Sequence, residues 1–164
     1  MKPWTPVVER LGCFGKQCKE GYNFEWPTQY MVDRWPTDRK IKLCRITTNW
    51  TSLRAIQMHL TPNFKSDEMA CEEKAMNNKE FMVNTQGAPM TEIGVKMNGQ
   101  MQIYGLRFTY ATGDVHNLFE ADGGIWKTRP IPAGKEIIGI YGNAGEERIY
   151  SLGFIIWTPN PMAL

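Results

Sequence analysis

The sequence predicts an all-β domain made of three related β-hairpin units. Short apolar runs bounded by Gly, Asn and Pro follow one another along the 164 residues, and aromatic and β-branched residues occur throughout. One strand-like segment recurs, because residues 103–108 (IYGLRF) return as residues 149–154 (IYSLGF). Short strands that recur at a regular spacing are typical of repeated β-architectures. We therefore expect three sheets that bury their apolar faces around a common axis.

The first unit is the most divergent copy of the repeat. Residues 43–46 (LCRI) and 53–58 (LRAIQM) predict two strands, joined by a polar turn. Ile56, Leu106 and Leu152 occupy the same place in the three copies, at a spacing of roughly 46 to 50 residues. This spacing favours threefold pseudosymmetry over two unrelated hairpins in a β-sandwich, which stays the alternative.

The second unit has strands predicted at residues 92–95 and 103–110, with a turn at 96–102 that is rich in Asn and Gly. Asn and Gly tolerate the backbone angles that a chain reversal needs. Alternate residues of a strand point to opposite faces of the sheet. The large apolar side chains of the second strand should therefore share one face, which contains Tyr104, Leu106, Phe108 and Tyr110.

The third unit repeats this pattern near the end of the chain. Residues 136–140 and 149–154 predict two strands, joined by a turn at 142–148. Residues 66–76 are the one segment with helical spacing, and Ser66 is a suitable N-cap for it. A short helix and an irregular loop are both compatible with this segment.

Composition argues against several function classes. The net charge is +2 and the 19 basic residues are scattered, which does not indicate nucleic-acid binding. No run approaches the roughly 18 apolar residues of a membrane span. The N-terminus lacks the apolar region of a secretory signal, so we expect an intracellular protein. The cysteines are expected to be buried or isolated thiols in a reducing compartment; they are Cys13, Cys18, Cys44 and Cys71.

The sequence predicts binding rather than catalysis. His59 and His116 are the two histidines, and neither has a Ser or Cys partner at a spacing typical of a nucleophile and its base. Asp114 and His116 share a turn, but two ligands do not make a metal site. No glycine-rich phosphate loop or dinucleotide motif is present. We therefore expect no catalytic residues, no metal and no cofactor.

Four segments carry a resemblance to a known family. Residues 105–113 (GLRFTYATG), 131–142 (IPAGKEIIGIYG) and 151–154 (SLGF) follow one another in the order of the strand and turn motifs of the jacalin-related lectins. Residues 11–15 (LGCFG) resemble the N-terminal glycine loop of that family, with fewer glycines. The resemblance is strongest after about residue 90.

This resemblance implies a β-prism I fold, in which three Greek-key sheets are related by pseudo-threefold symmetry. It implies one domain that spans residues 1–164. The tryptophan-rich segment at about 26–40 looks like an insertion that the family does not need.

The resemblance also implies a sugar site between the N-terminal glycine loop and the loop before the last strand. An Asp of the family accepts charge-assisted hydrogen bonds from adjacent sugar hydroxyls there. Tyr150 stands at that position in this chain, and Tyr104 and Arg54 stand at the equivalent positions of the other units. Glu146 or Glu147 is either a substitute acceptor or a solvated turn residue. The candidate sugar-binding residues are Gly12, Gly145, Glu146, Glu147, Arg148 and Tyr150.

Two functions fit these observations. The preferred one is a non-catalytic protein-interaction module or structural subunit of a larger assembly, with its sugar site remodelled. Trp26, Trp35 and Trp157 are the candidate anchors for a protein partner, because aromatic residues are enriched at interfaces. Replacement of Trp35 by Ala should then weaken assembly and leave melting nearly unchanged. The alternative is a carbohydrate-binding lectin that uses the loops at Gly12 and at 142–150.

Overall fold

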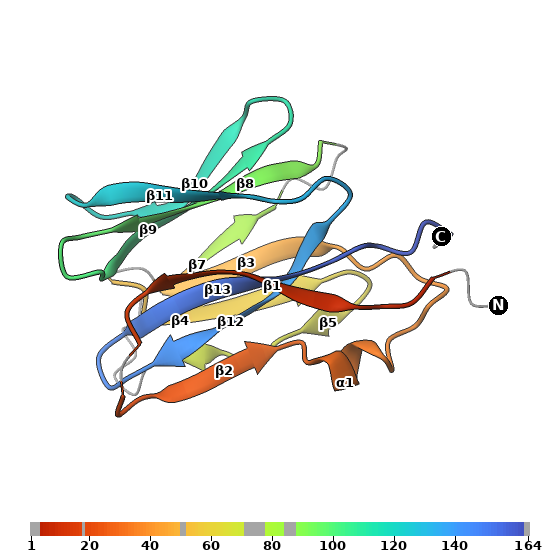
Figure 1. Ribbon diagram of the computed structural model, residues 1–164, viewed down its shortest axis with the longest axis horizontal. Coiled ribbons are helices and arrows are strands. Elements are labelled where there is room, and N and C mark those ends of the chain that lie inside the picture. Colours follow the sequence, from red (N-terminus) through yellow and green to blue (C-terminus); the bar gives the residue numbers. More distant parts are fainter. Residues whose placement is uncertain (1–3, 18, 50–51, 71–77, 84–87, 163–164) are drawn as a thin grey trace.

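The protein folds into three antiparallel β-sheets (Figure 1). The computed structural model describes residues 4–17, 19–49, 52–70, 78–83 and 88–162. Cys18 and Cys71, and parts of the predicted segments 47–52 and 66–76, lie outside these residues.

Sheet A joins the two ends of the chain. Its strand order is β1-β13-β12-β2, so the first two strands flank the last two, and all neighbours are antiparallel. Every residue of β13 except Tyr150 is buried, because this strand lies inside the sheet. The strands are β1 (Val8–Gly15), β2 (Tyr22–Trp26), β12 (Glu136–Ala144) and β13 (Ile149–Trp157).

Sheet B contains the most divergent repeat. Its strands follow the order β5-β4-β3-β7, and β6 pairs separately with β4. The strands are β3 (Leu43–Asn49), β4 (Ala55–Leu60), β5 (Phe64–Lys65), β6 (Met69–Ala70) and β7 (Asn78–Met82).

The possible helix that would start at Ser66 is absent from the described part of that segment. Ser66 is buried, and its hydroxyl accepts a hydrogen bond from the Met58 backbone N–H at 3.0 Å. Ser66 thus fastens the chain to β4, and the residues after it form β6. Pairing with a sheet edge outweighs the local helical pattern here.

Sheet C has the strand order β10-β9-β8-β11. Leu106, Phe108 and Tyr110 of β9 are buried, as predicted. Tyr104 is only half-buried, and Ile103 is buried in its place, at a register shift in the pairing with β8. The strands are β8 (Met90–Met97), β9 (Ile103–Tyr110), β10 (Val115–Glu120) and β11 (Ile125–Pro130).

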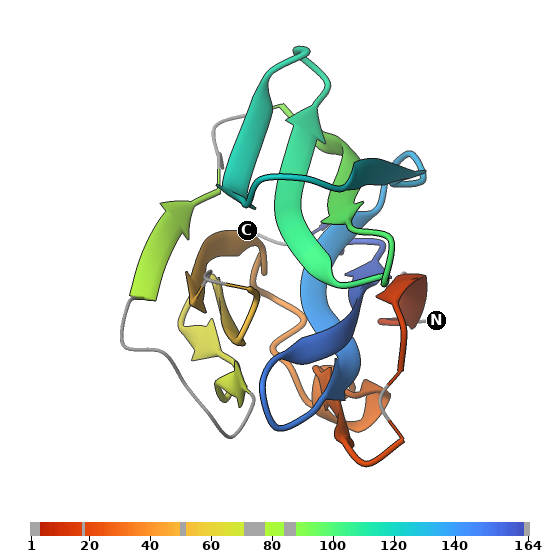
Figure 2. The same cartoon turned by 90° about the vertical axis from the view of Figure 1, so that its left-hand side faces the viewer.

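The three sheets share one topology, which confirms the predicted three-sheet architecture. In sheets B and C a hairpin is extended by the next strand on one side and by a later strand on the other, which is the Greek-key order. Sheet A has the same order when the chain is followed from β12 and β13 to β1 and β2. Figure 2 shows the sheets arranged around a common centre.

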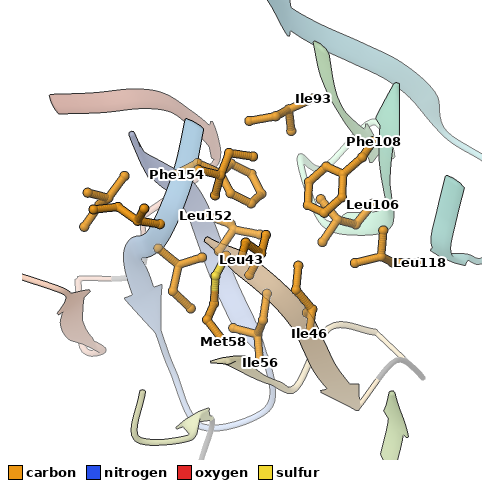
Figure 3. Close-up of a cluster of buried hydrophobic side chains, with 14 of the residues drawn as sticks. Leu43, Ile46, Ile56, Met58, Ile93, Leu106, Phe108, Leu118, Leu152 and Phe154 are labelled. Carbon is orange, nitrogen blue, oxygen red and sulfur yellow. The ribbon is translucent and has the colours of Figure 1, made fainter. Parts of the chain in front are cut away.

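The core lies where the inner faces of the three sheets meet. Phe108 of sheet C and Phe154 of sheet A form an edge-to-face pair, with ring centroids 6.0 Å apart. Ile46 and Ile56 of sheet B are fully buried beside them. Figure 3 shows these side chains, together with Leu43, Met58, Ile93, Leu106, Leu118 and Leu152.

The connection between β2 and β3, which holds most of the predicted insertion, ties the two chain ends to the domain. It contains the short helix α1 (Gln29–Val32). Gln29 donates a hydrogen bond to the Pro6 carbonyl at 2.7 Å, and Asn160 donates one to the Thr37 carbonyl at 2.6 Å. Segments before β1 and after β13 are therefore both held by this connection.

The candidate interface tryptophans pack against one another. Trp35 stacks on Phe64 with ring centroids 5.1 Å apart, and it also contacts Trp26 at 6.0 Å and Trp157 at 5.8 Å. Trp157 is 2% exposed and belongs to the core, so its ring does not reach the surface of this chain. Trp26 and Trp35 are half-buried.

Candidate functional site

Three loops come together at one end of the sheets and form the candidate site, which we call the end-loop site. The loops connect β1 to β2, β12 to β13, and β8 to β9. Pairing of Gly15 with Ser151, and of Tyr22 with Ala144, places the first two loops side by side. In Figure 1 they lie at the left-hand end, away from the chain termini.

Tyr150 stands in the centre of the end-loop site because Gly145 leaves room for its ring. A Cβ atom added at Gly145 would lie 2.2 Å from Cε2 of Tyr150. The Gly145 backbone N–H donates to the Arg148 carbonyl at 3.0 Å, which closes the turn between β12 and β13. Any larger residue at position 145 would therefore displace the tyrosine ring.

Arg148 and Gln102 form the polar side of the site. The guanidinium carbon of Arg148 lies 4.8 Å from the centroid of the Tyr150 ring. The Gln102 amide, with its oxygen turned toward Arg148, accepts hydrogen bonds from both terminal nitrogens at 2.9 and 3.1 Å. The β8–β9 loop thus fixes the arginine beside the ring.

Two hollows lie on the two sides of Tyr150. The glutamate-side hollow has a volume of about 290 Å³ and is lined by Glu20, Gly21, Tyr22, Ala144, Gly145, Glu146 and Tyr150. The arginine-side hollow has a volume of about 230 Å³ and is lined by Lys16, Gln17, Gln100, Met101, Gln102, Arg148 and Tyr150.

The structure brings together most of the predicted sugar-site residues. Gly145, Arg148, Tyr150 and Glu146 meet here, and exposed Glu147 lies in the same turn. Gly12 does not: it lies within β1, and a Cβ there would be 3.4 Å from Cα of Gly153.

Gly15 is the glycine that reaches the end-loop site. It has φ of +94°, and a Cβ there would lie 2.2 Å from the Tyr150 carbonyl oxygen. A glycine of the motif at 11–15 therefore lies beside Tyr150, three positions later than Gly12. Both glycines belong to the same motif at 11–15, so the sequence indicated the motif but not which of its glycines lies beside Tyr150.

Sequence reasoning missed Gln17, Glu20 and Gln102. None of them belongs to a recognisable motif. Their place in the site depends on how the loop backbone folds, which a sequence pattern does not specify. The predicted turn at 96–102 could have pointed to Gln102, since it joins the strands equivalent to β12 and β13.

The two histidines lie elsewhere. His59 on the outer side of sheet B contacts Arg45 through Nδ1 at 3.1 Å and the Thr47 hydroxyl through Nε2 at 3.2 Å. Partial burial, reinforced by the Arg45 charge, lowers the pKa of His59. His116 is exposed and packs edge-on against the Tyr110 ring.

No ligand set for a metal ion and no membrane-spanning helix is found among the residues that the structure describes. None of their His, Cys, Asp and Glu side chains form a group of three or more that could hold a metal ion. The described helix is too short to cross a membrane.

Comparisons with known proteins show the fold. No protein-family profile and no curated protein matches the sequence. Among solved structures, the mannose-binding lectin from Champedak has a TM-score of 0.63 at 11% identity, covering 94% of this chain and 98% of that one. AcmJRL, a mannose-binding jacalin-related lectin from Ananas comosus, has a TM-score of 0.63 at 17% identity, covering 91% and 96%. The prostate-specific WGA16 glycoprotein lectin has a TM-score of 0.62 at 14% identity, covering 88% and 97%. The chain therefore has the β-prism fold of the jacalin-related lectins.

Proposed function

We propose that this protein is a non-catalytic carbohydrate-binding module whose ligand binds at the end-loop site. The observation that carries this proposal is the position of Tyr150, which stands between two polar hollows. Solved lectins that share the fold include mannose-binding proteins, which supports a glycan ligand.

The chemistry of the end-loop site suits a ligand with many hydroxyl groups. An aromatic ring offers an apolar face to the C–H groups of a sugar, while the surrounding polar groups fix its orientation. Arg148 supplies donors, and Glu20 and Glu146 supply carboxylate acceptors. The Tyr150 hydroxyl makes no hydrogen bond with another described residue, so it is free to bond to the ligand.

This arrangement departs from the chemistry that the family resemblance implies. No Asp lies at the position of Tyr150, and the ring takes up the space between the two loops. We therefore assign recognition to stacking on Tyr150 together with hydrogen bonds from Arg148 and Glu146.

A role as a protein-interaction module or structural subunit stays a prediction. Its anchors were three tryptophans, and those side chains contact one another or Phe64. Their packing therefore gives that function less support than the end-loop site gives carbohydrate binding.

The test is a glycan-array screen of the purified chain, followed by calorimetry with mannose, galactose and the best array ligand. Tyr150→Ala should lower the affinity at least tenfold, because it removes the stacking surface. Tyr150→Asp should lose affinity to the same extent; a gain would mean that the Asp chemistry of the family operates instead.

Tyr30→Ala is the matched control. Tyr30 is 67% exposed, and the guanidinium carbon of Arg34 lies 3.4 Å from its ring centroid, so it forms a similar tyrosine–arginine pair on α1. Its replacement should leave glycan affinity unchanged. An array without any binding to folded protein would refute the proposed function.

A further inference from the structure

The outer face of sheet A carries a third and larger hollow beside the end-loop site. We call it the outer-face hollow; its volume is about 480 Å³, within the roughly 300–1,000 Å³ range of small-molecule sites. Gly15, Gly142 and Ser151 are among the residues that line it.

Ser151 provides a polar group inside this hollow that the protein itself does not use. The residue as a whole is 5% exposed, and its hydroxyl has no hydrogen-bond partner among the described residues. The hydroxyl is open to solvent through the hollow, so it can donate to or accept from a bound hydroxyl group. A ligand in the hollow would supply this partner.

A stack of three side chains forms one wall. The Tyr141 ring lies over Gly153, where a Cβ would be 2.3 Å from its Cε1. The guanidinium carbon of Arg10 lies 4.6 Å from the centroid of that ring, and Arg10 Nη2 donates to Glu25 Oε2 at 2.9 Å. Burial raises the pKa of Tyr141, so its hydroxyl stays protonated and can donate.

The charges of this wall cancel. Arg10 and Glu25 form an ion pair, so together they favour neither an anion nor a cation. Both side chains still have free donor or acceptor positions, which suit hydroxyl groups. The wall therefore favours a neutral polar ligand.

Amide groups also line the outer-face hollow and connect it to the end-loop site. Asn23 Oδ1 accepts hydrogen bonds from Gln17 and from buried Asn143, each at 3.0 Å. Gln17 lines the outer-face hollow and also the arginine-side hollow. A ligand that extends past Gln17 would therefore contact both Tyr150 and Ser151.

We propose that the outer-face hollow is a second carbohydrate subsite, so that the ligand is a neutral oligosaccharide which extends from Tyr150 around Gln17 to Ser151 and Tyr141. This inference rests on the proposed function for the end-loop site. Shared Gln17, the unpaired Ser151 hydroxyl and the neutral Arg10–Glu25 pair carry it.

Protection of Cys13 from alkylation tests occupancy directly. Cys13 is an exposed free thiol that lines the outer-face hollow, whereas Cys44 is a half-buried thiol on sheet B. The probe is the neutral trisaccharide that binds best on the array, or mannotriose if the array is silent. Mass spectrometry should show slower iodoacetamide labelling of Cys13 with the trisaccharide, and unchanged labelling of Cys44.

Two variants test the contribution of the subsite to affinity. Ser151→Ala and Glu25→Gln should each weaken trisaccharide binding by roughly five- to tenfold, because the first removes a hydroxyl and the second replaces a charged acceptor by a neutral amide and breaks the Arg10–Glu25 ion pair. Monosaccharide binding at Tyr150 should not change. Glu80→Gln is the control, because Glu80 forms a similar exposed ion pair with Arg45 on sheet B at 3.6 Å.

The outcomes separate this inference from the proposed function. Trisaccharide binding that depends on Tyr150, without protection of Cys13 and without an effect of Ser151→Ala, would overturn the second subsite alone. Protection of Cys13 that is unaffected by Tyr150→Ala would support the outer-face hollow and overturn the end-loop site. No binding and no protection would overturn both.

Discussion

Replacement of Gly145 by Ala should disturb the candidate site through a single contact. The new Cβ would lie 2.2 Å from Cε2 and 2.9 Å from Cδ2 of Tyr150, so the ring must move away. Gly145 does not have a positive φ, so Ala meets no backbone penalty of its own. The substitution therefore tests the position of the Tyr150 ring rather than the conformation of the turn.

The expected cost follows from the contacts that are lost. Overpacking costs about 1–3 kcal/mol in a core, and the low end applies here because the half-buried ring borders two hollows. Loss of the Arg148–Tyr150 contact adds about 0.5–1 kcal/mol. A total near 2 kcal/mol corresponds to a Tm lower by roughly 4–8 °C for a chain of this size. Glycan affinity should fall by at least tenfold, because the ring no longer divides the two hollows.

Thermal melting and calorimetry measure the two effects, and a double-mutant cycle identifies their cause. In a Tyr150→Ala background, Gly145→Ala should cost less than about 0.5 kcal/mol, because no ring remains to clash.

Gly105→Ala is the matched control on sheet C. Its Cβ would lie 2.9 Å from Cη2 of Trp126, so it should lower Tm without changing glycan affinity. A Gly145→Ala protein with the Tm and affinity of the parent chain would refute the assigned position of Tyr150.

Two further predictions concern stability. Trp35→Ala should lower the free energy of unfolding by about 3 kcal/mol, since Trp35 contacts Trp26, Phe64 and Trp157; an unchanged urea midpoint would instead support its role as an exposed anchor. Because the pKa of His59 is lowered from 6.5 in the folded protein, the unfolded chain binds the proton more readily, and stability should decrease as pH falls through about 6.5. The Tm of a His59→Gln protein should vary less between about pH 7.5 and pH 5 than that of the parent chain, and equal slopes would contradict this.

The sequence was sufficient to predict the fold because the repeat is carried by buried residues. The segment at 103–108 and its copy at 149–154 became β9 and β13, with Leu106 and Leu152 both fully buried. A core position tolerates few side chains, so the pattern persists in the sequence. The outer strands were harder to foresee: β5 and β6 are two residues long and carry no pattern of their own.

The site was predicted only in part, because it depends on the register between strands. The motif at 11–15 pointed to the segment that lies beside Tyr150, but it did not show that Gly15, rather than Gly12, makes this contact. That choice depends on the bulge between Leu11 and Phe14 in the pairing of β1 with β13. The bulge sets where β1 ends relative to β13, and no local sequence preference specifies it.

Comparison of sheets A and C indicates why the outer-face hollow formed on only one of these two related faces. The pairing of β8 with β9 and of β12 with β13 makes Lys96 the counterpart of Asn143, and Arg107 the counterpart of Gly153. In sheet C the Arg107 guanidinium carbon lies 4.2 Å from a ring centroid of the Trp126 indole, and Lys96 Nζ donates a hydrogen bond to Glu120. Long side chains therefore cover this face. In sheet A the counterparts are short, and the space that they leave is the hollow. The same repeat therefore gives a closed face where the residues are long and a candidate binding face where they are small.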